Sequence, residues 1–157
     1  MFSLMADANW KGFDLSVQLQ GAALCDKLLC GEWNNGARDQ TPLTRPFYAG
    51  WDNAPYYLVE NSWRPDNTNA EYPRLSKRDN ENNTKASTYW QRNGAFLKLK
   101  NLEVGFNHKF FRVYLRGSNL LTFSPFKYWD PEMGSGSGLS YPTQRVFNVG
   151  VQFSINK

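Results

Sequence analysis

The sequence lacks any apolar run of the roughly 18 residues that a membrane-spanning helix requires. This absence excludes a transmembrane helix but not a membrane β-barrel, whose strands need only about 9–11 residues with alternate side chains facing lipid. The N-terminus also lacks the basic stretch and small-residue cleavage site of a secretory signal. If the chain is exported, we therefore expect it to be a piece of a longer protein.

Side chains that hold metals are scarce. The chain has two cysteines, Cys25 and Cys30, and one histidine, His108, which lies far from both in sequence. A tetrahedral site needs four such ligands, so we expect no metal site and no cofactor. For the cysteines two alternatives stay open: a local disulfide, which an exported chain can form, or two unrelated loop thiols.

Signatures of catalysis or nucleic-acid binding are also missing, so we expect no enzyme. The glycine- and serine-rich residues 134–138 have no strand–helix frame around them and are interpreted as a flexible loop, not a phosphate cradle. Asp130 and Glu132 are interpreted as solvated loop charges rather than an acid–base pair. The basic residues are dispersed despite a formal net charge of +4, so nucleic acid is not an expected partner.

Aromatic residues, by contrast, are abundant, at 16% of the chain. Trp and Tyr suit interfaces because their rings are apolar while their N–H and O–H groups stay hydrated. Outer-membrane barrels carry aromatic girdles at both membrane surfaces for this reason. Sugar-stacking surfaces and large β-cores use the same residues, so composition alone does not separate these classes.

Apolar and polar residues alternate with a period of two in several segments, which predicts β-strands. Two of them, residues 2–9 and 13–20, are joined by a short turn and predict an antiparallel hairpin. In residues 95–106 the alternation slips by one position, and a β-bulge near Lys100 and Asn101 would restore a common apolar face.

Further strands are predicted over residues 111–116 and, as the final strand, 145–155. Between the hairpins, residues 22–94 are predicted to form a long extracellular loop, with a helical turn or two over 22–29, and residues 119–144 a second loop. Short and long connections alternate as they do between the periplasmic and extracellular ends of an outer-membrane barrel. We therefore predict an all-β fold over residues 1–157: about five antiparallel strands of a partial transmembrane barrel.

The same periodicity fits a soluble antiparallel sheet, whose apolar face covers a core. Strands of about ten residues, the directional connections and the lack of an amphipathic helix to cover a sheet favour the barrel. On that interpretation Asp14, Gln18, Arg112 and Arg116 point into the lumen. The alternative is a freestanding soluble β-module that binds carbohydrate through exposed aromatic residues.

Aromatic residues of the long loop are the candidates for contact with a ligand or partner, although girdle and loop-packing roles are favoured for them. These candidates are Trp33, Trp51, Tyr56, Tyr57 and Trp63.

Six groups of short motifs, in order along nearly the whole chain, resemble those of SusC/RagA-type TonB-dependent outer-membrane transporters. They are KGFDLS at 11–16, WRPDN at 63–67 with YPR at 72–74, LKLKNLEVGF at 97–106, RVYL at 112–115 with GSNLLTF at 117–123, WDPE at 129–132 and YPTQRVFNVGV at 141–151. Each motif alone is weak, but six in the family's order are specific. The chain departs from the family at its end, where Ser154 to Lys157 follow Phe153 in place of a terminal aromatic residue.

The resemblance implies the C-terminal portion of a barrel in the bacterial outer membrane, in contact with its lipid. It implies import of oligosaccharide or peptide nutrients, a SusD-type lipoprotein as a lid over the outer mouth, and energy from TonB, which would act through an N-terminal part that this sequence does not contain. It implies no covalent chemistry.

Overall fold

The computed structural model describes residues 1–33, 41–47 and 54–154. The chain forms two compact units. The first comprises Met1–Asp26, Asn93–Met133 and Tyr141–Lys157, and the second comprises Lys27–Arg92 and Gly134–Ser140.

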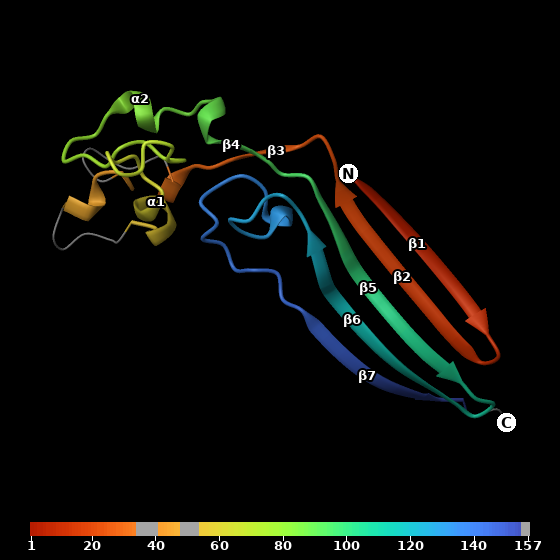
Figure 1. The fold of residues 1–157 in the computed structure, drawn as a ribbon. Helices are drawn as coiled ribbons and strands as arrows, with labels where there is room; N and C mark the ends of the chain where they lie inside the picture. Colours follow the sequence, from red (N-terminus) through yellow and green to blue (C-terminus); the bar gives the residue numbers. More distant parts are fainter. Residues whose placement is uncertain (34–40, 48–53, 155–157) are drawn as a thin grey trace. The chain divides into compact units, whose positions relative to one another are not determined.

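Five antiparallel strands form one sheet in the first unit, in the order β1-β2-β5-β6-β7 (Figure 1). They are β1 (Phe2–Trp10), β2 (Phe13–Ala22), β5 (Phe96–Asn107), β6 (Phe111–Phe123) and β7 (Val146–Phe153). Neighbouring strands in this order are also neighbours in the chain, apart from the long insertion between β2 and β5. The predicted all-β class is confirmed: the sheet is antiparallel, has five strands and is not closed.

The β1–β2 hairpin turns through Lys11 and Gly12, which both have positive φ angles, of 47° and 89°. Such a turn matches the right-handed twist of the two strands it joins. Glycine adopts this conformation without strain because it has no Cβ, which explains its place at the second position. The hairpin predicted for these residues is therefore confirmed.

The predicted bulge in β5 is also present. Gln18 and Leu19 of β2 pair with Asn101 and Leu99, so Lys100 is an extra residue in the ladder. A bulge of this kind lets two successive side chains point to the same side of the sheet. Lys100 and Asn101 therefore both reach the polar face, and the leucines on either side keep a common apolar face.

Apolar side chains line up in rows on one face of the sheet, because the register of all five strands keeps the alternation in phase. One row consists of Ala8, Leu15, Val104, Leu115 and Val149; the next consists of Trp10, Phe13, Phe106, Val113 and Val151. These large side chains are 37–76% exposed. The described residues therefore leave this face without a core against it.

The segments between β2 and β5 and between β6 and β7 hold short elements. They are β3 (Asp26–Leu28), η1 (Gly31–Trp33), η2 (Arg45–Phe47), α1 (Tyr56–Glu60), α2 (Glu81–Thr84), η3 (Thr88–Trp90), β4 (Gln91–Asn93) and η4 (Pro131–Met133). No helix in the described part of the chain is long and apolar enough to cross a membrane.

Two segments differ from the sequence predictions, one in its type of secondary structure and one in where a strand ends. The helical turn suggested for residues 22–29 is wrong: β3 pairs with β4 there, and the Leu29 amide donates to the Trp90 carbonyl oxygen at 2.9 Å. Pairing with a distant segment satisfies the backbone groups that a helical turn would have satisfied locally. Strand β6 continues through Asn119 to Phe123, since Leu121 and Phe123 pair with Leu99 and Leu97.

An aromatic cluster forms the core of the second unit. Tyr72, which is 1% exposed, stacks between Trp33 and Trp90 with ring centroids 6.4 and 6.0 Å away, and Tyr57 meets it edge-on at 6.0 Å. Rings bury a large apolar area each, which a segment poor in aliphatic residues needs in order to fold. These aromatic rings therefore pack the core of this unit.

Candidate functional site

Three of the predicted lumen residues belong to one charge network on the polar face of the sheet. Arg112 donates to Glu103 at 2.7 Å and also pairs with Asp14, and Glu103 pairs in turn with Arg116. Glu103 on β5 thus pairs with two arginines of the neighbouring strand β6, whereas Arg112 reaches Asp14 on β2 across Gly105 of the intervening strand β5. The sequence analysis did not name Glu103 as a lumen residue. Glu103 lies two residues after Asn101 on β5, and this spacing places both side chains on the same face of the sheet.

Gln18, the fourth predicted lumen residue, lies in a separate chain of neutral hydrogen bonds on the same face. The Asn101 amide donates to its side-chain oxygen at 2.6 Å, and the Ser118 hydroxyl donates to Asn101 at 2.8 Å. The three side chains sit directly opposite one another on β2, β5 and β6. The polar side chains of this face are therefore linked to one another by ion pairs and hydrogen bonds.

Tyr114 contacts the two arginines of the charge network through its ring. Its ring lies under the guanidinium groups of Arg112 and Arg116, with centroid distances of 5.0 and 5.9 Å. The ring occupies the space over Gly150, its cross-strand partner, where any Cβ would collide with it.

Replacing Gly150 by alanine is expected to destabilise the folded protein by about 1–3 kcal/mol, because the methyl group displaces the Tyr114 ring from both arginines. Urea unfolding of the protein measures this loss of stability. In a Tyr114→Ala background the same glycine substitution should cost almost nothing, since the colliding ring is gone. Equal costs in the two backgrounds would contradict the packing argument.

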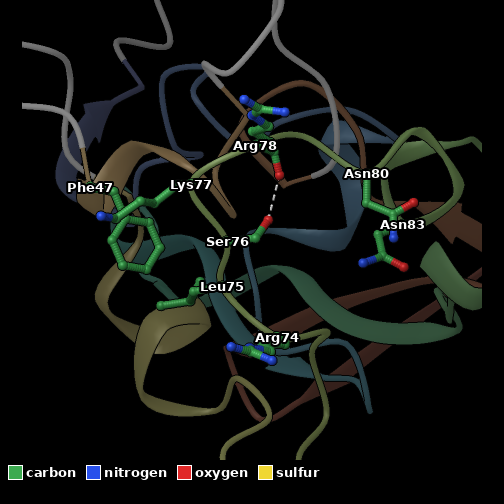
Figure 2. Close-up of a pocket in the computed structure, with 8 residues that line it drawn as sticks. All are labelled: Phe47, Arg74, Leu75, Ser76, Lys77, Arg78, Asn80 and Asn83. Carbon is green, nitrogen blue, oxygen red and sulfur yellow. Dashed lines mark hydrogen bonds between the residues drawn. The ribbon is translucent and has the colours of Figure 1, made fainter.

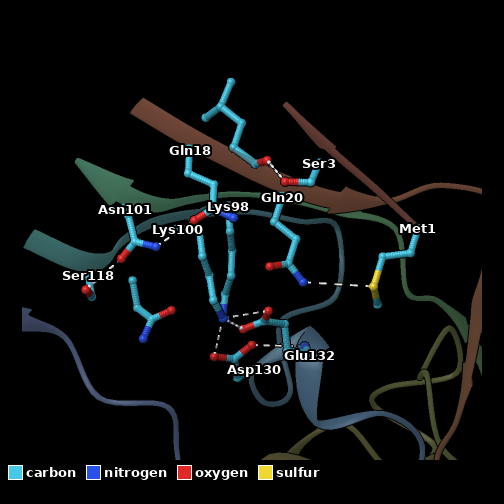
Figure 3. A network of polar contacts seen from close by, with 12 residues as sticks. Met1, Ser3, Gln18, Gln20, Lys98, Lys100, Asn101, Ser118, Asp130 and Glu132 are labelled. Carbon is cyan, nitrogen blue, oxygen red and sulfur yellow. Dashed lines mark hydrogen bonds and ion pairs between the residues drawn. The ribbon is translucent and has the colours of Figure 1, made fainter. Parts of the chain in front are cut away.

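A second charged cluster lies at the other end of β5 (Figure 3). Lys98 donates to Asp130 at 2.7 Å and to Glu132 at 2.6 Å, and Lys100 donates to Glu132 at 2.8 Å. The Lys98 side chain is 1% exposed and each carboxylate is 16% exposed. We call these four residues the lysine–carboxylate cluster.

The expectation that Asp130 and Glu132 are solvated loop charges is therefore wrong. Burial by itself raises the pKa of each carboxyl, but hydrogen bonds outweigh it, from Lys98 to Asp130 and from Lys100 and Lys98 to Glu132. The pKa of both groups consequently lies below its ordinary range. The cluster fastens η4 to the strand, since both carboxylates accept hydrogen bonds from lysines of β5.

Of the aromatic residues proposed to contact a ligand or partner, one is buried and three are exposed. Trp33 is 9% exposed, and its indole N–H donates to the Ser137 carbonyl oxygen at 3.1 Å, so it packs within the unit. Tyr56, Tyr57 and Trp63 are 77%, 46% and 38% exposed and keep ring surface available. The Tyr57 hydroxyl donates to Glu71 at 2.9 Å. Trp51 lies outside the described residues.

Two adjoining hollows lie on the second unit, and sequence reasoning did not anticipate them. One, of about 550 Å³, is shown in Figure 2 with its lining residues Phe47, Arg74, Leu75, Ser76, Lys77, Arg78, Asn80 and Asn83. The other, of about 390 Å³, shares Phe47, Arg74 and Leu75 with it and adds Ser62, Trp63, Arg64 and Pro65. We call them together the basic groove. Their only sequence signal was the cluster of basic residues between 74 and 78.

Metal-ligating side chains do not gather in the described ranges: no group of three or more His, Cys, Asp or Glu residues is suited to hold an ion there. Cys25 and Cys30 are free and half-buried. His108 lies in the β5–β6 turn, exposed, with its ring stacked on Phe111 at 4.9 Å.

Comparison with known proteins gives consistent matches in sequence and in fold, although no family model matches the chain. The chain is 32% identical to TonB-dependent receptor P3 of Formosa agariphila over 92% of its own length and 15% of that protein's. It is 28% identical to TonB-dependent receptor P26 of the same organism, over 59% of the chain and 12% of that protein. The chain thus spans less than a fifth of the curated relatives it matches.

Solved structures of the RagAB peptide importer share the fold. The open-open state superposes with a TM-score of 0.65 and 23% identity, over 98% of this chain and 17% of that one. The closed-closed state gives a TM-score of 0.62 and 25% identity, over 96% and 16% of the two chains.

An open antiparallel sheet with an uncovered apolar face, matched to these proteins, defines a β-barrel segment of a bacterial outer-membrane protein. The chain belongs to the SusC/RagA type of TonB-dependent receptors.

Proposed function

We propose that this chain forms part of the wall of an outer-membrane importer for oligosaccharide or peptide nutrients. The observation that carries the proposal is the two-sided sheet, apolar and uncovered on one face and internally bonded and charged on the other. In a barrel the apolar face meets lipid and the polar face meets the lumen. Asp14, Gln18, Arg112 and Arg116 then line the path of the nutrient.

The connections support an orientation for the sheet. Lys11 and Gly12 join β1 to β2 at one end of the strands, and residues 108–110 join β5 to β6 at the same end. The long segments between β2 and β5 and between β6 and β7 leave from the opposite end. Outer-membrane barrels have short periplasmic turns and longer extracellular loops. The second unit, between β2 and β5, accordingly lies outside the cell, where Tyr56, Tyr57 and Trp63 contact the nutrient or a lid.

Two partners complete the proposal. RagAB, whose fold this chain shares, is a peptide importer. A SusD-type lipoprotein closes the outer mouth here, and TonB supplies energy through a part of the receptor outside this sequence. Whether the nutrient is a glycan or a peptide is argued below from the basic groove.

Growth on defined nutrients tests the proposal. A strain lacking the full-length receptor is expected to stop growing on one class of oligosaccharide or peptide and to recover when the gene is restored. Deleting the gene of a SusD-type lipoprotein that co-purifies with the receptor should remove growth on the same nutrient, and a proton uncoupler should stop its uptake. Unchanged growth on a broad panel of glycans and peptides would refute import of such nutrients.

A further inference from the structure

We propose that the basic groove of the second unit binds an acidic oligosaccharide, one that carries carboxylate or sulfate groups. The inference rests on the proposed import function and names the substrate class for it. It starts from the charge of the lining. Among the described residues that line the two hollows, four are cationic and none is acidic: Arg64, Arg74, Lys77 and Arg78.

Among the described residues, neither Asp79 nor Asp66 neutralises Arg74 or Arg78. The Asp79 carboxylate accepts hydrogen bonds from the Thr41 and Thr84 hydroxyls, at 3.3 and 3.4 Å, and does not line the groove. Asp66 pairs with Arg64 at 3.5 Å, but both are well exposed, and such surface pairs are weak. The cationic character of the groove therefore centres on Arg74 and Arg78.

These two arginines are four residues apart in a segment without regular secondary structure. Figure 2 shows Arg74 and Arg78 at opposite ends of the hollow, with Leu75 and Ser76 between them. The Ser76 amide donates to the Leu43 carbonyl oxygen at 3.1 Å, and its hydroxyl donates to the Arg78 carbonyl oxygen at 2.5 Å. Guanidinium groups bind carboxylate or sulfate oxygens through paired N–H donors, so two separated guanidinium groups suit a ligand with repeated anionic groups.

The remaining lining matches sugar rather than a generic anion. Phe47 and Trp63 are 47% and 38% exposed, which leaves apolar ring faces to cover the C–H faces of sugar rings. The Trp63 amide donates to the Tyr72 carbonyl oxygen at 2.9 Å, which fixes this segment to the buried aromatic core. Asn80 and Asn83, together at one side of Figure 2, carry amide donors and acceptors for hydroxyl groups.

Binding to the full-length receptor in detergent tests the site, by calorimetry with four probes. They are a hexamer of galacturonate, a sulfated oligogalactan, neutral maltohexaose and hexaglutamate. At least one acidic glycan is expected to bind at least tenfold more tightly than maltohexaose and hexaglutamate, and to weaken as salt is raised. Binding of neither acidic glycan, or equal binding of hexaglutamate, would overturn the proposal; the latter would indicate an acidic peptide.

Paired substitutions locate the site. Arg74→Gln with Arg78→Gln is expected to weaken binding of the acidic glycan about a hundredfold, roughly tenfold for each lost charge-assisted contact. Lys85→Gln with Arg145→Gln removes the same charge outside the groove and should leave affinity within about twofold. Trp63→Ala should weaken the acidic glycan while leaving the salt dependence unchanged. Equal affinity of the two double variants would overturn the site.

Failure here is separable from failure of the import function. If the receptor resides in the outer membrane and imports a nutrient while the Arg74/Arg78 variant binds and imports it normally, the groove assignment is wrong and import stands. If the groove binds acidic glycan but the cells never take it up, the binding site stands and the import function is wrong.

Discussion

Replacing Lys98 by methionine is expected to raise the fraction of receptor with η4 detached from the sheet about a hundredfold. Methionine keeps the unbranched shape but leaves Asp130 without its lysine, whereas Glu132 keeps Lys100 at 2.8 Å. Removing one partner of a buried ion pair costs about 3–5 kcal/mol. Because the carboxylates are 16% exposed, we expect a cost near the lower limit, about 3 kcal/mol, which corresponds to roughly a hundredfold.

Limited proteolysis measures this change. When opening and closing are fast relative to cleavage, the cleavage rate follows the population of the open form, so cleavage between residues 124 and 144 should accelerate by the same factor. Lys127→Met removes a lysine from the same segment outside the cluster and should leave the rate unchanged. In Lys98→Met/Asp130→Asn the unpaired charge is gone, and most of the protection should return. No rescue would rule out the electrostatic account.

The same cluster predicts a dependence on pH with a definite sign. Carboxyls whose pKa is lower in the folded state stabilise it above their unfolded pKa of about 4, and that contribution is lost as pH falls through the folded values. Cleavage of the wild-type receptor should therefore accelerate below about pH 4. The Lys98→Met/Asp130→Asn variant should show a smaller acceleration, because one of the two carboxyls is missing.

The lysine–carboxylate cluster also shows what a local pattern can and cannot predict. Alternation requires Lys98 and Lys100 to lie on the polar face once the bulge is placed, and the bulge follows from the phase slip among the leucines of β5. Pairing with Asp130 and Glu132 depends on the path of residues 124–133 back to β5. That path is set by contacts such as the nearly buried Phe126, which have no periodicity to reveal them.

The second unit was harder to predict for the same physical reason. Its core joins Trp33, Tyr72 and Trp90, which are far apart in a segment whose described residues form only short strands and short helices. Composition shows that these rings are present but not which of them are buried. Trp33 and Trp63 looked equivalent in the sequence, yet one packs inside and the other lines the basic groove.

Arginine at Val17 is expected to prevent or severely weaken assembly of the receptor in the membrane, with a cost of about 2–4 kcal/mol. Val17 lies in the middle of β2 on the apolar face, between Ala6 of β1 and Leu102 of β5. A charged side chain placed there must enter the hydrocarbon core, and the penalty is greatest near the bilayer midplane. Urea titration of the full-length receptor in lipid vesicles measures the loss.

The neighbouring residue provides a matched control, because successive side chains of a strand point to opposite faces. Ser16 lies on the polar face between Asp7 and Glu103, so an arginine there meets carboxylates and water. Ser16→Arg is expected to change stability by less than about 1 kcal/mol, the range of a cross-strand charge pair. Two substitutions one residue apart should thus differ by at least about fivefold in the folding equilibrium.

This pair of variants also decides what the apolar face meets. If the face met water, Val17→Arg would add a charge to an uncovered surface and be nearly neutral or favourable for solubility. If the face met lipid, only Ser16→Arg would be tolerated. The rows of large apolar residues that continue from β1 to β7 require the second outcome, because no described element covers them and their exposure to water would drive aggregation. Equal tolerance of both arginines would remove the physical basis for placing this sheet in a membrane.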